Sequence, residues 1–145
     1  MKEQPIYNAL TIDVEDYFQV AALAEAVRRE DWHSMEYRVE ANTNRLLSLL
    51  DKHNTKATFF TLGWVAEKSP ELVRSIQKAG HEIASHGYSH QLIYNQIPEV
   101  FREETRKSKA ILEDITGEPI IGYRAASYSI TNQSRWALDI LAEEG

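Results

Sequence analysis

The sequence predicts an α/β fold in which parallel strands alternate with helices. Short apolar runs at residues 9–14, 57–62, 81–85 and 120–123 alternate with segments that have helical apolar spacing or helix-boundary residues. Three of these runs end in polar motifs, and parallel α/β folds place their active sites at such strand ends. The chain of 145 residues has the length of one domain. We therefore expect one domain with about four strand–helix units.

The first half of the chain contains two expected strands separated by a long excursion. Residues 9–14 form the first expected strand, which ends in acidic side chains. A short helix is expected over 18–29, and an amphipathic helix is expected around the leucines at 46–50. The second strand follows at 57–62.

The second half of the chain has clearer helix boundaries. Ser69 and the proline after it suit the start of a helix that ends near Gly80. The third strand is expected at 81–85, and a helix opened by a proline covers 98–117. After the fourth strand, a cap at 131–132 begins the last helix.

The composition argues against several classes of protein. The chain has 16 basic and 22 acidic residues, a net charge of −6, and no basic stripe that would bind nucleic acid. It has no cysteine, so any metal must be held by imidazole and carboxylate groups. No apolar run reaches membrane-spanning length, and residues 1–5 lack the apolar part of a signal peptide. We therefore expect a cytoplasmic protein without a membrane segment.

His86 and His90 are the first candidate metal ligands. Their spacing predicts that they lie one turn apart on a helical face, where two imidazoles can hold a single ion. Gly87 occupies the position at which a zincin peptidase carries its glutamate, so the sequence excludes that class of peptidase.

An acidic cluster at the end of the first expected strand could complete this metal site. Strand alternation places Asp13 and Glu15 on one face and Val14 on the other. One carboxylate could then bind the ion while the other takes a proton from water. If the strand ends at Val14, Asp16 could replace Glu15 as the ligand, and both remain candidates.

The end of the fourth expected strand supplies a third group of candidates. The guanidinium of Arg124 would hold a catalytic carboxylate ionised and oriented. Ser127 and Tyr128 follow in a loop whose backbone amides could face a developing oxyanion.

Three motifs in this order resemble those of the NodB-type polysaccharide deacetylases, carbohydrate esterase family four. They are residues 11–13 with the acids that follow, HGYSH at 86–90, and RAASY at 124–128. The stretch LTIDVEDYFQV at 10–20 is most similar to the subfamily found in exosortase and exopolysaccharide gene clusters. The resemblance implies that 1–145 is the N-terminal part of one NodB-homology domain, an incomplete, distorted (β/α) barrel.

The resemblance also implies an activity: a hydrolase in which a metal-activated water removes N-acetyl groups from an acetylated polysaccharide or oligosaccharide. It assigns the base to Asp13, the orienting arginine to Arg124, and the metal ligands to Glu15, His86 and His90, with Asp16 as the alternative to Glu15. Zinc is the expected divalent metal, and cobalt and nickel are the alternatives.

The sequence departs from the family pattern in three places. Val14 separates two acids that are adjacent in most members, and Ala126 stands where most members have proline. The histidine that acts as general acid in the family would lie beyond Gly145. The chain alone is therefore expected to be inactive, and its open barrel edge could be covered by a second copy in a homo-oligomer.

Two other functions are consistent with the same residues. One is an amidohydrolase of the same fold that acts on a small ureide or amide. The other is a non-catalytic carbohydrate-binding or assembly module that keeps the metal ligands but does not turn over.

Overall fold

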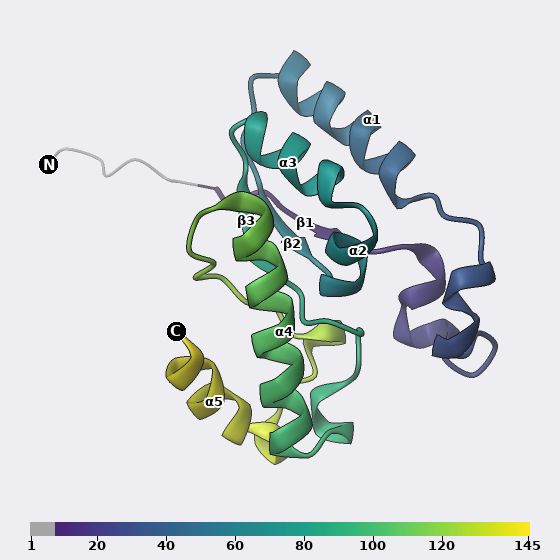
Figure 1. The fold of residues 1–145 in the computed structure, drawn as a ribbon, viewed down its shortest axis with the longest axis vertical. Helices are drawn as coiled ribbons and strands as arrows, with labels where there is room; N and C mark the ends of the chain where they lie inside the picture. Colours follow the sequence, from purple (N-terminus) through teal and green to yellow (C-terminus); the bar gives the residue numbers. More distant parts are fainter. Residues whose placement is uncertain (1–7) are drawn as a thin grey trace, which may run out of the picture.

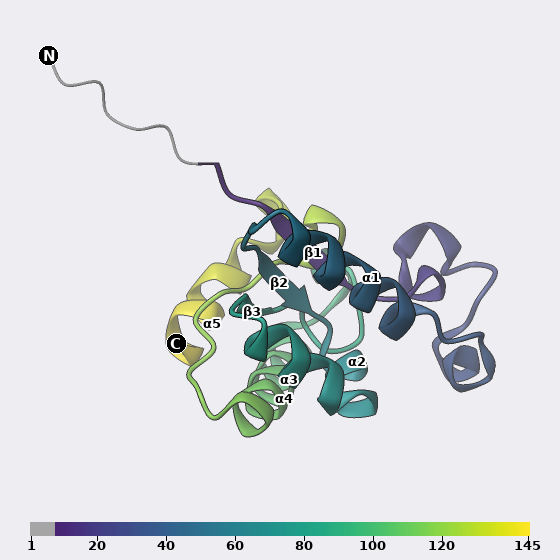
Figure 2. The same ribbon diagram turned by 90° about the horizontal axis from the view of Figure 1, so that it is seen from above.

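A computed structural model of the chain describes residues 8–145, and Figures 1 and 2 show its fold in two views. Three parallel strands form an open sheet in the order β1 (Thr11–Val14), β2 (Thr58–Thr61) and β3 (Glu82–Ser85). Because all three strands run in the same direction, their carboxyl ends lie at one edge of the sheet. Residues 1–7, on which the expectation of no signal peptide depends, lie outside the described residues.

Five α-helices accompany the sheet in the described part of the chain. They are α1 (Val39–Lys52), α2 (Gly63–Lys68), α3 (Pro70–Lys78), α4 (Pro98–Thr116) and α5 (Trp136–Glu144). Figure 1 shows α1, α3 and α4 in front of the sheet, with α5 beside α4. Within residues 8–145, none of the helices has the length and apolar character needed to cross a bilayer.

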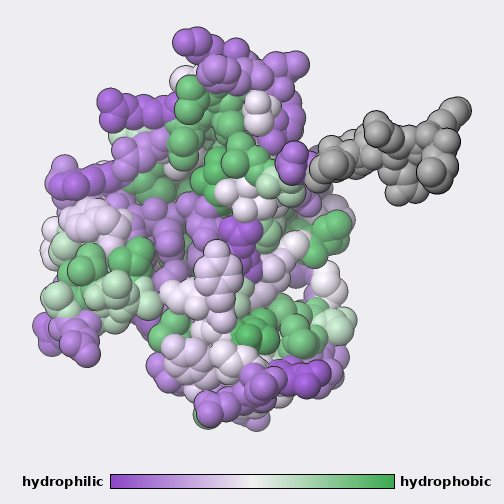
Figure 3. Space-filling view, turned by 180° about the vertical axis from the view of Figure 1, so that it is seen from behind, coloured by the Kyte–Doolittle hydropathy of each residue, from purple (hydrophilic) through white to green (hydrophobic). Residues whose placement is uncertain are grey.

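The main hydrophobic core lies between the sheet and these helices. Val14 and Phe59 point from the strands into this core, where they join Val73, Ile76 and Leu112, all at most 1% exposed. The strand residues that alternate with them face the opposite side of the sheet, where Asp13 pairs in register with Phe60. Seen from that side, in Figure 3, polar surface lies between apolar patches. The fold therefore has one face packed by helices and one open face.

The α/β class and the first three strands are confirmed by this arrangement, but the expected fourth strand is not formed. Tyr123 makes only an isolated parallel bridge to Ser85. Ser85 N–H donates to the carbonyl of Gly122 (2.8 Å) and Arg124 N–H donates to the carbonyl of Ser85 (2.9 Å), whereas the N–H of Ile120 donates to the side chain of Glu113 (3.0 Å) and not to β3. The described residues thus form an open three-stranded sheet and not a closed barrel.

The helix expected over 18–29 is also wrong. The chain there forms short 3-10 turns at Tyr17–Gln19, Ala21–Leu23 and Arg29–Ser34, and it is extended at Val20 and Arg28. Residues 22–26 are all exposed, so a longer helix at this place would have no buried apolar stripe to stabilise it.

Candidate metal centre

Glu15, His86 and His90 meet at the carboxyl ends of β1 and β3. One ligand atom from each of these side chains lies within 4.8 Å of the other two. Glu15 Oε2 is 2.8 Å from His90 Nε2 and 3.8 Å from His86 Nε2. Both imidazoles are buried, and the carboxylate is partly buried. This set of one oxygen and two nitrogen atoms is typical of a catalytic zinc site with an open position.

The hydrogen bonds of His86 leave one ring nitrogen available as a ligand. Its Nδ1–H donates to the backbone carbonyl of Arg124 (2.8 Å), so Nε2 carries the free lone pair. Burial lowers the pKa of His86, although the nearby carboxylates of Asp13 and Glu15 oppose this effect. The side chain is therefore neutral at pH 7, as a metal ligand has to be.

Unpaired polar atoms also fit a bound cation. Glu15 Oε2 and His90 Nδ1 are buried and have no hydrogen-bond partner among the described residues. A buried carboxylate oxygen without a donor is costly unless something else compensates its charge. A divalent ion held by Glu15, His86 and His90 would provide that compensation.

The two histidines lie in a loop, so the expectation of a helical face is wrong. The backbone turns at Gly87 (φ 76°) and again at His90 (φ 53°), which brings the two rings to a centroid separation of 5.3 Å. The backbone N–H groups of Gly63 and Trp64 donate to the carbonyls of Gly87 (2.7 Å) and Tyr88 (3.1 Å). The first turn of α2, which the sequence did not predict, therefore holds the histidine loop in place.

Asp13 lies beside this cluster and is paired with Arg124. Arg124 Nη1 donates to Asp13 Oδ1 (2.6 Å), and Asp13 Oδ2 is 4.0 Å from His86 Nε2. Arg124 Nη2 also donates to Thr11 Oγ1 (2.8 Å), and the guanidinium lies 4.0 Å from the centroid of the Phe60 ring. The sequence placed Thr11 in the first motif without giving it a role, and Phe60 belongs to no polar motif.

Asp16 points away from the cluster and is 3% exposed. Its carboxylate accepts hydrogen bonds from the backbone N–H groups of Tyr17 (2.9 Å), Arg38 (2.6 Å) and Val39 (2.9 Å). These bonds connect the end of β1 to the start of α1. The structure thus brings Glu15, and not Asp16, to the two histidines.

Ser127 and Tyr128 line the same pocket as Asp13, Glu15 and the two histidines, with a volume of about 190 Å³. Both residues have left-handed backbone conformations, with φ of 49° and 54°. Such strain in residues other than glycine is common at binding and catalytic sites. Tyr128 is 84% exposed, so its ring stands free at the pocket.

Comparison with known proteins identifies the family. A family model described as polysaccharide deacetylase matches residues 31–142, which include both histidines and Arg124 but not β1. A peptidoglycan-N-acetylglucosamine deacetylase of Bacillus cereus is 36% identical over 98 residues, or 67% of this chain and 36% of that protein. A chitooligosaccharide deacetylase of Bradyrhizobium sp. is 28% identical over 100 residues, or 69% of this chain and 43% of that protein.

Solved structures agree with this result. A structure from Mycobacterium smegmatis, assigned to the polysaccharide deacetylases, has 31% identity and a TM-score of 0.74, and the match covers 93% of this chain and 47% of that one. The chain thus spans only part of the length of the relatives it matches. Because the family model covers most of its residues, this chain belongs to the polysaccharide deacetylase family.

Proposed function

We propose that the chain carries the metal-binding side of the active site of a polysaccharide N-deacetylase. The observation that supports this most strongly is the convergence of Glu15, His86 and His90 beside the Asp13–Arg124 ion pair. A metal site of this kind next to a separate carboxylate has the parts that amide hydrolysis requires.

Zinc is the proposed ion, with cobalt and nickel as alternatives, since imidazole and carboxylate ligands suit all three. Bound at Glu15, His86 and His90, it would supply Lewis-acid activation of water and of the amide carbonyl.

Asp13 is the proposed general base. It would accept a proton from the attacking water as the water oxygen bonds to the acetyl carbon. Arg124 holds this carboxylate in one orientation through Oδ1, so that Oδ2 remains on the side facing His86. Thr11 holds the second nitrogen of the guanidinium, which restricts Arg124 in turn. A separate acid would protonate the leaving nitrogen as the C–N bond breaks, which releases acetate and leaves a free amine on the sugar.

Ser127 is the proposed donor to the oxyanion. The backbone N–H of Tyr128 already donates to the carbonyl of Ala125 (3.3 Å). The N–H of Ser127 makes no hydrogen bond to another described residue, so it remains available to an acceptor in the pocket. A donor held in place before the charge develops is the arrangement that lowers the barrier to acyl transfer.

The proposed substrate is an N-acetylated polysaccharide or oligosaccharide. Support comes from the relatives, which are described as peptidoglycan and chitooligosaccharide deacetylases. The similarity of residues 10–20 to the exopolysaccharide-locus subfamily favours an exopolysaccharide.

Acetate release from N-acetylated chitooligosaccharides tests the proposal, with the protein that contains this chain loaded with zinc. Asp13→Asn should keep the metal but lower the rate by about 10²-fold or more, because the general base is lost. Asp31→Asn is the matched control: Asp31 pairs with Arg28 in an exposed turn, and its variant should keep the wild-type rate. An Asp13→Asn variant with the wild-type rate would refute the assignment. Zinc binding by the wild type without acetate release would instead support a non-catalytic binding module.

A further inference from the structure

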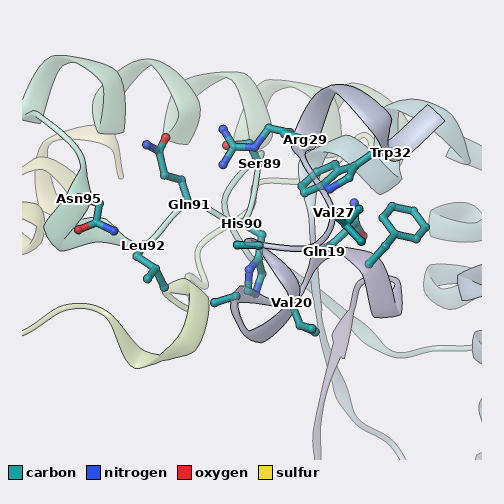
Figure 4. Close-up of a pocket in the computed structure, with 13 residues that line it drawn as sticks. Gln19, Val20, Val27, Arg29, Trp32, Ser89, His90, Gln91, Leu92 and Asn95 are labelled. Carbon is teal, nitrogen blue, oxygen red and sulfur yellow. The ribbon is translucent and has the colours of Figure 1, made fainter. Parts of the chain in front are cut away.

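A second cavity of about 260 Å³ lies next to the metal centre, and Figure 4 shows its lining residues. Lining residues between 18 and 32, in the segment that follows β1, form one side of the cavity, and lining residues between 89 and 95 form the other. Its volume is slightly below the range of about 300–1,000 Å³ that is usual for small-molecule sites. The cavity therefore has room for a single small ring or substituent.

This cavity adjoins the candidate active site. Val20 and His90 line both pockets, and Figure 4 shows these two side chains next to each other. A polymer whose N-acetyl group lies at the metal centre would therefore place a neighbouring sugar at or near the second cavity.

The charge of the cavity differs from that of the whole chain. The chain has a net charge of −6, yet no aspartate or glutamate lines this cavity. Its cationic side chain is Arg29, whose guanidinium lies 5.7 Å from the centroid of the Trp32 ring and makes no ion pair with another described residue (Figure 4). The nearby acids Glu30 and Asp31 are both paired with Arg28 instead.

Gln19 supplies a second, independent observation. The side chain lines the cavity and is only 3% exposed. Its Oε1 accepts the backbone N–H of Asp16 (2.7 Å), which determines which end of the amide is Nε2. Nε2 is buried and has no hydrogen-bond partner among the described residues. A buried donor without an acceptor is costly, so the cavity favours a ligand that brings an acceptor.

We propose that this cavity binds the carboxylate of an acidic sugar next to the residue that is deacetylated. The guanidinium of Arg29 would pair with the carboxylate, and Gln19 Nε2 would donate to one of its oxygens. The apolar side chains of Val27 and Leu92 would contact the sugar ring. This inference rests on the proposed deacetylation, and it specifies an acidic polymer as the substrate.

The test measures binding to metal-free protein, so that a carboxylate cannot bind through an ion at Glu15 and the histidines. Two acidic probes are used: D-glucuronate carries its carboxylate on the ring, and N-acetylmuramate carries it on a lactyl ether. Glucose is the neutral control. We expect at least one acidic probe to bind roughly tenfold more tightly than glucose, by titration calorimetry or NMR. The probe that binds identifies the source of the carboxylate. Equal binding of all three sugars would overturn the proposal.

Variants then localise this binding. Arg29→Gln should remove the preference for the acidic probe, and Gln19→Glu should weaken its binding by charge repulsion while keeping the acceptor for the N–H of Asp16. Arg45→Gln, at an exposed arginine of α1 outside the cavity, should bind as the wild type does. Circular dichroism checks that each variant is folded. Unchanged preference in folded Arg29→Gln protein would overturn the proposal. Because no metal or turnover is involved, this result is independent of whether the protein deacetylates.

Discussion

Two neighbouring carboxylates at the end of β1 have different roles because they face different groups. Glu15 Oε2 faces two imidazole nitrogens and has no hydrogen-bond donor among the described residues. Asp16 is fully engaged by three backbone N–H groups, two of them at the start of α1. Asp16 follows Glu15 directly and points to the other side of the chain, where the start of α1 supplies two of its three donors.

Substitutions at these two positions should therefore have opposite effects. Glu15→Gln removes a charged ligand and should lower the zinc content per chain, measured by elemental analysis, with little loss of stability. Asp16→Ala should keep the zinc content but lower the free energy of unfolding by about 1–3 kcal/mol, because buried N–H groups lose their acceptor. Loss of zinc in a folded Asp16→Ala variant would contradict this assignment.

The protonation of His86 should make stability depend on pH. Burial lowers the pKa of His86 in the folded chain, so the unfolded chain binds its proton more readily. Stability is therefore retained above the unfolded pKa of about 6.5 and decreases as the pH falls toward the lower, folded value. Burial also lowers the pKa of His81, which adds in the same direction.

Urea unfolding at several pH values in the presence of EDTA measures this effect. The free energy of unfolding should fall below about pH 6.5, by at most about 1.4 kcal/mol per pH unit for each histidine. A His86→Gln variant should show a shallower slope. Stability that rises toward lower pH in this range would contradict the prediction.

At the scale of elements, the short helix α2 positions the two histidines of the candidate metal centre. Its first two N–H groups hold the histidine loop, and Gly63 at its start lies against that loop and against α4. A Cβ atom on Gly63 would be 2.8 Å from the ring of Tyr88 and 2.9 Å from Ser108 Oγ. Glycine is therefore required here for the close approach of α2 to α4.

Gly63→Ala should destabilise the protein although alanine is the better helix former. Without the contacts, the substitution would add about 0.5–1 kcal/mol of stability, whereas overpacking costs about 1–3 kcal/mol. We expect a net loss in thermal or urea unfolding, together with weaker zinc binding because the histidine loop moves. The exposed Ser75→Ala change in α3 is the control and should stay within about 0.5 kcal/mol. A stabilised Gly63→Ala variant would show that the loop can move at little cost.

At the scale of the whole molecule, the sheet is open, and part of the surface of the molecule is apolar. Ile121 is 81% exposed and Leu138 is 51% exposed, and apolar patches are visible on the face opposite α1, α3 and α4 (Figure 3). The chain also spans only part of its relatives. Among the described residues, the pocket at the candidate metal centre is lined by no histidine or carboxylate other than Asp13, Glu15, His86 and His90.

The isolated 145-residue chain is therefore predicted to bind metal but to turn over slowly. Without a further acid to protonate the leaving amine, its rate of acetate release should be about 10²-fold or more below that of the Bacillus cereus relative. Zinc content near one per chain would show that the metal site is intact in the same sample. A rate equal to that of the relative would show that the chain supplies its own general acid.

The sequence by itself determined the α/β class, three of the strands and the identity of the polar motifs, because apolar periodicity and strand-end position are local properties. Asp13 and Glu15 line one pocket, as strand alternation predicted, although β1 ends at Val14 and Glu15 lies one residue beyond it. The spacing of His86 and His90 led to the wrong expectation of a helix. Spacing alone does not reveal that the backbone turns at Gly87 and at His90, so that both histidines lie in a loop. Tertiary contacts determined how the side chains of the site are arranged. The start of α1 donates backbone N–H groups to Asp16, α2 holds the histidine loop, and the backbone carbonyl of Arg124 orients His86. These contacts join residues 22 to 38 positions apart, so no local pattern encodes them.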